Sequence, residues 1–103
     1  MDGAETFRLL SDDCRLRIVA LLGQRPHTVA ELIVALGREQ SNVSHHLKAL
    51  REAGLVRSRY VGKFVLYELK DPMLVQLVTL GGHVAARVDE RCECVECAQE
   101  DQV

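Results

Sequence analysis

Apolar residues at helical spacing open the chain and predict two consecutive helices, in "AETFRLL" and "SDDCRLRIVALLG". The positions that share a face are Phe7, Leu9 and Leu10 in the first segment and Leu16, Val19 and Ala20 in the second. Asp12 is the expected N-cap of the second helix, because its carboxylate can accept hydrogen bonds from free backbone N–H groups. Gly23 and then Pro26 are expected to end this helix.

Two more short helices follow, separated by a tight turn that contains glycine. In "TVAELIVALG", Thr28 and Glu31 have the spacing of a capping box, and Gly37 is expected to end the helix. The next helix lies in "REQSNVSHHLKALREAGLV", with Ser41 as the expected N-cap and Gly54 as the end. Its apolar stripe is formed by Val43, Leu47 and Leu50. Two capped helices joined in this way are typical of a helix-turn-helix.

The period of the pattern changes to two in "LVRSRYVGKFVLYEL", which predicts two antiparallel strands joined at Gly62-Lys63. One strand alternates through Val56, Ser58 and Tyr60, and the other through Val65, Tyr67 and Leu69. Helical spacing returns after Asp71-Pro72, an N-cap followed by proline at the first helical position. The expected fold is therefore mainly α with a β-hairpin wing, a single-domain winged helix-turn-helix.

Composition agrees with a small helical domain. The chain has 103 residues, enough for one modest core, and its low aromatic content of 4% makes that core aliphatic. No apolar run is long enough to span a membrane. The N-terminal "MDGAETF" lacks the basic and apolar stretches of a secretory signal. We therefore expect a cytoplasmic protein, in which stable disulfides are uncommon.

The net charge of −2 hides a gradient along the chain. Residues 38–70 carry seven Lys/Arg and three Asp/Glu, whereas residues 71–103 carry two and seven. The basic middle segment can therefore face a polyanion while the acidic end faces away. A helix in the major groove needs short polar groups near its N-terminal end, and basic hairpin residues can hold phosphates. The candidate DNA-binding residues are Gln40, Ser41, Asn42, Ser44, His45, His46 and Lys48 on the helix, and Arg57, Arg59 and Lys63 on the hairpin.

The segments "LLSDDCRLRIVALL" and "SNVSHHLKALREAGLVRSRYVGKFVLYEL" resemble the ArsR/SmtB family of bacterial metal-sensing repressors. The resemblance implies a homodimer formed through the first and last helices. Two recognition helices would enter successive major grooves of double-stranded operator DNA with an imperfect palindrome. An inducer would bind the dimer, lower its DNA affinity and free the promoter of a resistance operon.

This chain lacks the residues of two metal sites that the family uses. Arsenic-responsive members often carry Cys-x-Cys on the first helix of the helix-turn-helix, where this chain has "HTVAELI". Zinc-type members place Asp-x-His and His-x-x-His or His-x-x-Glu on the terminal helix. In this chain Met73 stands two residues after Asp71, where the first motif has His. Ala86 stands three residues after His83, where the second motif has His or Glu. The sensing site is therefore expected to use thiols elsewhere in the chain.

Three cysteines near the end of the chain, Cys92, Cys94 and Cys97, are the candidate metal ligands. Thiolates select thiophilic ions, here As(III) or Sb(III) first and Cd(II), Pb(II), Zn(II) or Cu(I) next. Three sulfurs suit As(III) because its lone pair takes the remaining direction, whereas divalent ions need a fourth ligand such as Cys14, His83 or water. On a continuous helix Cys92 would point away from Cys94. We therefore expect the inducer to order the segment from about Cys92 onward.

Cys14 and the nature of the inducer leave alternatives open. Cys14 is a possible additional ligand, because Arg15, Arg17 and the helix N-terminus favour its thiolate, although two aspartates oppose this. The alternative is a small, half-buried structural residue. Closely spaced thiols can also oxidise, so a redox or persulfide switch on the same fold is the second hypothesis. An enzyme is not expected, because the sequence shows neither a paired general base nor a phosphate loop. The predicted organisation is a DNA-binding and dimerisation domain over residues 1–90 and an acidic cysteine-containing tail over residues 91–103.

Overall fold

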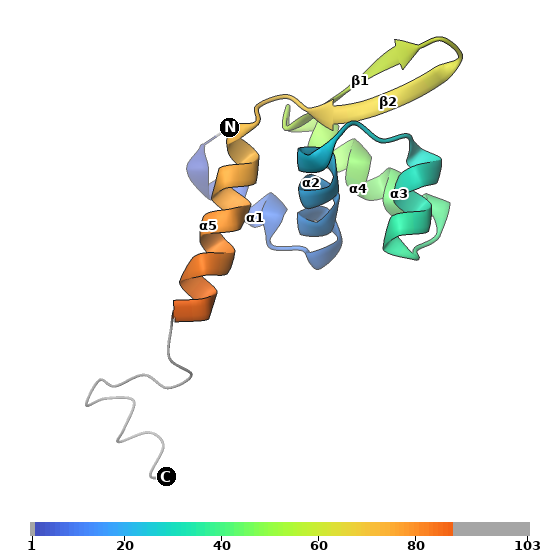
Figure 1. The fold of residues 1–103 in the computed structure, drawn as a ribbon. Coiled ribbons are helices and arrows are strands. Elements are labelled where there is room, and N and C mark those ends of the chain that lie inside the picture. Colours follow the sequence, from blue (N-terminus) through green and yellow to red (C-terminus); the bar gives the residue numbers. More distant parts are fainter. Residues whose placement is uncertain (1, 88–103) are drawn as a thin grey trace, which may run out of the picture.

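The structure, a computed structural model, describes residues 2–87 of the chain. Within that range, helices and a two-stranded sheet follow one another in the order that the sequence predicts (Figure 1). The elements are α1 (Gly3–Leu10), α2 (Asp13–Gln24), α3 (Val29–Leu36), α4 (Gln40–Glu52), β1 (Val56–Val61), β2 (Phe64–Leu69) and α5 (Met73–Arg87). The prediction of a mainly α winged helix-turn-helix is confirmed. The predicted tail, residues 91–103, lies outside the described residues.

Side chains cap two helices as the sequence predicts. Asp12 is the N-cap of α2, and its Oδ1 accepts the backbone N–H of Arg15 at 3.0 Å. Thr28 and Glu31 form the capping box of α3, in which each side chain accepts the other residue's backbone N–H at 3.2 and 3.0 Å. Such caps satisfy N–H groups that have no partner within the helix. They set the starting points of the two helices that support the helix-turn-helix.

The start of α4 differs from the prediction. The helix begins at Gln40, and Glu39 occupies the N-cap position without a side-chain hydrogen bond. Ser41 as N-cap is therefore wrong. The reason lies in Gly37, which caps α3 in the left-handed conformation with φ 64° and so turns the chain sharply. The turn between α3 and α4 is then short enough for Ser41 to fall in the first turn of α4, where it is exposed.

The core forms where α2, α3 and α4 meet, and β2 and α5 also contact α2. It contains Leu10, Cys14, Ile18, Val19, Leu22, Leu32, Leu36, Val43, Leu47, Leu50, Leu55, Val56 and Leu74. The α4 stripe of Val43, Leu47 and Leu50 is buried as predicted, whereas Ala20 of α2 is exposed. The buried residues of α2 are instead Cys14, Ile18, Val19 and Leu22. Burial of Val43, Leu47 and Leu50 fixes the rotation of α4 about its own axis. That rotation determines which residues of α4 are exposed to solvent.

The hairpin pairs Val56 with Leu69 and Val61 with Phe64, so Gly62 and Lys63 form a two-residue turn. Gly62 has φ 60°, the positive value that such tight turns require at their first central position. An isolated bridge between His27 and Tyr67 ties β2 to the loop before α3, with N–O distances of 3.0 and 2.8 Å. The wing is thereby attached to the helix-turn-helix at its base and extends from it (Figure 1).

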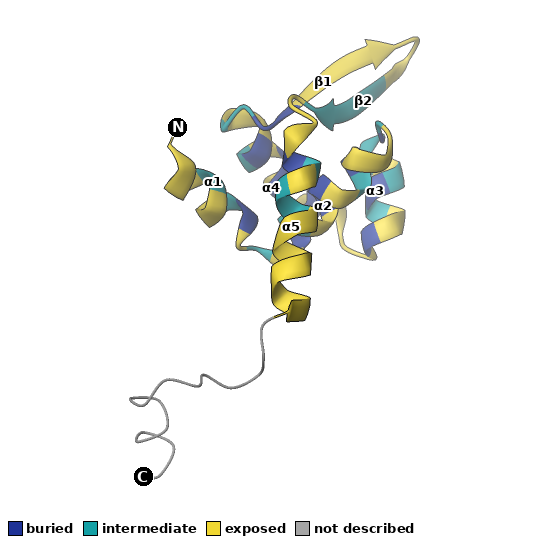
Figure 2. Ribbon diagram, turned by 60° about the vertical axis from the view of Figure 1, so that its left-hand side comes forward, coloured by how far each residue is buried: buried dark blue, intermediate teal, exposed yellow. Residues whose placement is uncertain are grey.

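The last helix, α5, packs against α2 along one side and is exposed along the other (Figure 2). The Oδ1 atom of Asp71 accepts the backbone N–H of Met73 at 2.9 Å, as the predicted N-cap should. Gly23 lies in the last turn of α2, one residue before its end at Gln24. A Cβ atom at Gly23 would lie 2.6 Å from Cγ2 of Val75, so this glycine lets α5 approach α2 closely. None of the helices within residues 2–87 is long and apolar enough to cross a membrane.

Candidate nucleic-acid interface

The exposed face of α4 is the first part of the candidate interface. Because Val43, Leu47 and Leu50 face the core, the opposite side of the helix points to solvent. The exposed residues of α4 are Gln40, Ser41, Ser44, His45, Lys48, Arg51 and Glu52, and Oε1 of Glu52 lies 4.0 Å from Nζ of Lys48. These side chains offer the mixture of hydrogen-bond donors and acceptors that base edges in a major groove require.

Two predicted DNA-binding residues of α4, Asn42 and His46, do not lie on its exposed face. Asn42 is half-buried, and its Oδ1 accepts a hydrogen bond from Sγ of Cys14 at 3.7 Å. His46 is only 9% exposed and faces α2, with Nε2 3.8 Å from Oδ1 of Asp12. The helical spacing carries this signal, because His46 lies three residues after Val43 and therefore shares the face of Leu47 and Leu50, whereas His45 does not. The geometry assigns His46 to the packing between α2 and α4 rather than to the exposed face.

The wing carries the second part of the candidate interface. Arg57 and Arg59 are two residues apart on β1 and therefore project from the same face of the sheet. Both donate to Oε1 of Glu68 on β2, from Nε atoms at 3.0 and 3.1 Å. Lys63 lies in the turn, with its Nζ 5.5 Å from the centre of the Phe64 ring. The wing thus places cations on an exposed hairpin, and Glu68 offsets part of their charge.

Cys14 is the cysteine that the structure describes, and it is a free thiol that is 6% exposed. Burial raises the pKa of this thiol, and the nearby carboxylate of Asp12 raises it further. Arg17 lowers the pKa as expected of a nearby cation, and Arg38 does the same, but the loss of hydration outweighs both. Cys92, Cys94 and Cys97, the predicted metal ligands, lie outside the described residues.

Asp12, Cys14 and His46 come together where the first turn of α2 meets the middle of α4. One ligand atom from each of the three lies within 4.8 Å of the other two. The hydrogen bond from the Arg15 backbone N–H lowers the pKa of Asp12, and His46 lowers it further. We call these three residues the α2–α4 cluster. Sequence spacing alone does not predict this cluster, because His46 is remote in the chain from the other two residues.

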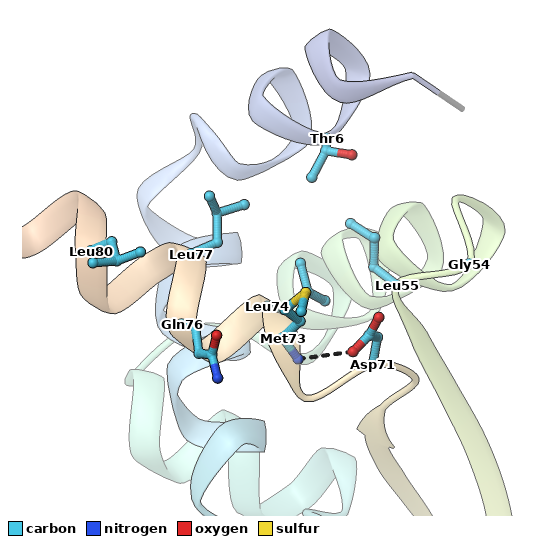
Figure 3. Close-up of a pocket in the computed structure, with 9 residues that line it drawn as sticks. All are labelled: Thr6, Gly54, Leu55, Asp71, Met73, Leu74, Gln76, Leu77 and Leu80. Carbon is cyan, nitrogen blue, oxygen red and sulfur yellow. Dashed lines mark hydrogen bonds between the residues drawn. The ribbon is translucent and has the colours of Figure 1, made fainter.

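An apolar surface runs along α5. Met73, Leu80 and Val84 lie on one side of this helix and are 66%, 59% and 60% exposed. A cavity of about 450 Å³ lies between α1, the start of α5 and Leu55, with Leu77 and Leu80 on its lining (Figure 3). Phe7 of α1 is 61% exposed beside a second cavity of about 560 Å³. Apolar surface of this extent marks an interaction site more often than free surface.

An exposed polar helix over a buried stripe, followed by a basic hairpin, defines a winged helix-turn-helix DNA-binding regulator. Residues 12–58 match the family described as "Bacterial regulatory protein, arsR family". The chain is 38% identical over 86 residues to the HTH-type transcriptional regulator Rv0081 of Mycobacterium tuberculosis. The aligned residues cover 82% of this chain and 75% of that protein. The chain therefore belongs to the ArsR family of bacterial regulatory proteins, whose members are transcriptional regulators and not enzymes.

Solved structures agree with this assignment. The crystal structure of M. tuberculosis Rv0081 matches with a TM-score of 0.75 at 38% identity, over 82% of this chain and 85% of that one. The homodimeric winged helix-turn-helix domain of Mb0332 from Mycobacterium bovis matches with a TM-score of 0.72 at 30% identity, over 81% and 77%. A probable mercury resistance operon repressor of Streptomyces lividans is 34% identical over 91 residues, which is 88% of this chain and 73% of that protein.

Proposed function

We propose that the protein is a homodimeric, cytoplasmic repressor of a metal or metalloid resistance operon, released from its operator by a thiophilic ion. The exposed face of α4 is the observation that carries the DNA-binding part. Its polar side chains lie opposite a fully buried stripe, so the helix presents them as a rigid set. Ser41, Ser44 and His45 would read base edges, while Lys48 would hold a phosphate.

The wing would add phosphate contacts to those of α4. Arg57, Arg59 and Lys63 lie on the exposed hairpin, which extends beyond the body of the domain (Figure 1). Their charges contribute affinity that does not depend on sequence and that weakens with salt. The local excess of positive charge over residues 38–70 supports this assignment although the whole chain is acidic. The expected operator is an imperfect palindrome in double-stranded DNA, because a twofold dimer reads two related half-sites.

The dimer would form through α1 and α5. The exposed side chains of Phe7, Leu80 and Val84 and the cavity beside Leu77 make a surface that a second copy of the chain can cover. The homodimeric M. bovis relative supports a second copy as the occupant of this surface. Dimerisation fixes the distance between the two α4 helices, which determines whether both can enter successive grooves. A ligand that changes the packing at α5 therefore changes DNA affinity.

Cys92, Cys94 and Cys97 would bind the inducer, As(III) or Sb(III) in preference to Cd(II), Pb(II) or Zn(II). The support is chemical: three thiols close together in sequence, directly after α5, are the ligands that thiophilic ions prefer. The mercury resistance repressor of S. lividans, a relative named for a thiophilic metal, agrees with this class of inducer. A coupling of about 1.4 kcal/mol changes affinity tenfold, so ordering a short segment beside the dimer interface is sufficient.

The test is a DNA-binding titration of the full chain on an operator selected by the protein itself from a random-sequence duplex library. Fluorescence anisotropy would be measured with As(III), Sb(III), Cd(II), Pb(II) and Zn(II), in a phosphine reductant that has no competing thiol. We expect As(III) or Sb(III) to release the DNA. Cys92→Ser, Cys94→Ser and Cys97→Ser should each bind DNA as before and respond less to the ion.

Three outcomes would contradict the proposal. Release by As(III) that survives in the triple cysteine-to-serine variant would move the sensing site elsewhere in the chain. Release by an oxidant or a persulfide in metal-free buffer, reversed by reductant and unaffected by any ion, would favour the redox-sensing alternative. Failure to select any duplex at low salt would remove the DNA-binding function itself.

A further inference from the structure

We propose that Asp12, Cys14 and His46, the α2–α4 cluster, form a second site that binds one divalent ion of the zinc class. This site takes its ligands from α2 and α4, and its ligand chemistry differs from that of the C-terminal cysteines. It joins the first turn of α2 to the helix that is expected to enter the DNA groove. Occupation would therefore fix α4 against α2 directly.

The surroundings of His46 point to a ligand. The side chain is 9% exposed, and its Nδ1 atom is buried without a hydrogen-bond partner among the described residues. The other ring nitrogen, Nε2, is 3.8 Å from Oδ1 of Asp12, which is longer than a hydrogen bond. An ion bound at Nε2 would satisfy the ring nitrogen that faces Asp12, while Nδ1 would stay without a partner among the described residues. Imidazole nitrogen is also one of the preferred ligands of zinc-class ions.

The spacing of the cluster is close to that of a tetrahedral site. With bonds of about 2.3 Å to sulfur and 2.0–2.2 Å to nitrogen and oxygen, ligand atoms on one ion lie roughly 3.3–3.7 Å apart. The three ligand atoms here lie within 4.8 Å of one another, and the measured oxygen-to-nitrogen distance is 3.8 Å. Closing the set requires side-chain movements of roughly 1 Å. Asn42, whose Oδ1 is 3.7 Å from Sγ of Cys14, or a water would take the fourth position.

The charge and the ligand types also fit such an ion. One thiolate and one carboxylate carry two negative charges, so a bound divalent ion leaves the half-buried cluster neutral. The mixed sulfur, nitrogen and oxygen set suits zinc-class ions, whereas As(III) prefers three sulfurs. Asp12 keeps its capping role, because Oδ1 has two lone pairs and can accept the Arg15 N–H while it binds the ion. The ion replaces the thiol proton, which is released to solvent.

The test uses the full chain with Cys92, Cys94 and Cys97 replaced by serine, so that Cys14 supplies the sulfur. Anaerobic titration with Co(II), a spectroscopic substitute for Zn(II), should give a thiolate-to-cobalt charge-transfer band and tetrahedral d–d bands, with one ion per chain. Adding Cys14→Ser should abolish the charge-transfer band, and His46→Gln should weaken Co(II) binding by roughly a hundredfold. Zn(II) should displace Co(II) and raise the melting temperature.

His45→Ala is the matched control, because His45 is adjacent to His46 but exposed, and it should leave Co(II) binding unchanged. Circular dichroism of each variant without metal separates loss of the site from loss of the fold. The proposal fails if the triple-serine chain shows no charge-transfer band, or if His46→Gln in that chain binds Co(II) as tightly as before. Neither result bears on As(III) sensing, which is tested by DNA release in chains that keep the C-terminal cysteines.

Discussion

Glu68 on β2 lies directly opposite Arg57 on β1, and its Oε1 accepts a hydrogen bond from Arg57 Nε at 3.0 Å. The same oxygen accepts from Arg59 Nε at 3.1 Å. One carboxylate thus holds two of the three basic side chains of the wing that we assign to phosphate contact. The wing is therefore less positive toward DNA than its arginines suggest, and Glu68 sets a limit on non-specific affinity.

Glu68→Gln should strengthen binding to any duplex, because both arginines then lose their charged partner. The slope of log affinity against log salt should steepen by up to about 0.9 for each additional phosphate contact. Thermal stability should change little, since exposed ion pairs contribute only about 0–1 kcal/mol. Glu5→Gln on α1 is the control, as it changes the net charge equally without a wing arginine. An equal gain in both variants would show that overall charge, and not Glu68, is responsible.

Replacing each of the adjacent histidines of α4 should affect a different property: DNA affinity for His45 and the free energy of unfolding for His46. His45 is exposed, so His45→Ala should change the free energy of unfolding by less than about 0.5 kcal/mol. It should also reduce affinity for the selected operator by about 1–3 kcal/mol, the value of a good base contact. His46 is buried, so His46→Ala should lower the free energy of unfolding by about 1–3 kcal/mol. Urea denaturation and anisotropy on the same samples would separate the two effects, and a reversed pattern would show that α4 is rotated differently.

Gly23→Ala should destabilise the protein even though alanine is the better helix former. The added Cβ would meet Cγ2 of Val75 at 2.6 Å, and such overpacking costs about 1–3 kcal/mol. This exceeds the gain of up to about 1 kcal/mol from helix propensity. The double variant Gly23→Ala, Val75→Ala should recover stability relative to Val75→Ala alone, as measured by urea denaturation. A stabilised single variant would mean that α5 can move away from α2 at little cost.

Acid should weaken the fold partly through Glu31. Its hydrogen bond from the Thr28 backbone N–H, with Arg25 nearby, lowers the pKa of this carboxyl from 4.5 to about 2. The charged form is therefore favoured in the folded state, and its stabilising effect is complete above about pH 4.5 and is lost as the pH falls toward 2. Glu31→Gln should make the melting temperature depend less on pH between about pH 2 and 4.5. Part of the dependence should persist, since Asp12 also has a lowered pKa.

Glu39→Gln serves as the comparison for this measurement. Glu39 occupies the N-cap position of α4 and forms no side-chain cap bond. The variant should keep the full acid dependence of the unsubstituted protein. A matching loss in both variants would assign the effect to net charge instead of to the capping box.

Much of the fold was predictable because its determinants are local. A capping box needs residues three apart, a hairpin needs alternation around a two-residue turn, and a buried stripe needs helical spacing. Thr28 with Glu31, the Gly62-Lys63 turn and the Val43 stripe all follow from such spacing, and all are confirmed. The ordering of the segment from Cys92 onward by an inducer stays a prediction.

By itself, the sequence determined which elements form, where most of them end and which segment carries the positive charge. Tertiary structure decided which faces meet. It brought His46 beside Asp12 and Cys14, raised the pKa of Cys14 by removing water, and paired both wing arginines with Glu68 through the strand register. The reason is physical: hydrogen bonds within a turn depend on a few consecutive residues, whereas hydration and charge pairing depend on groups that only folding brings together.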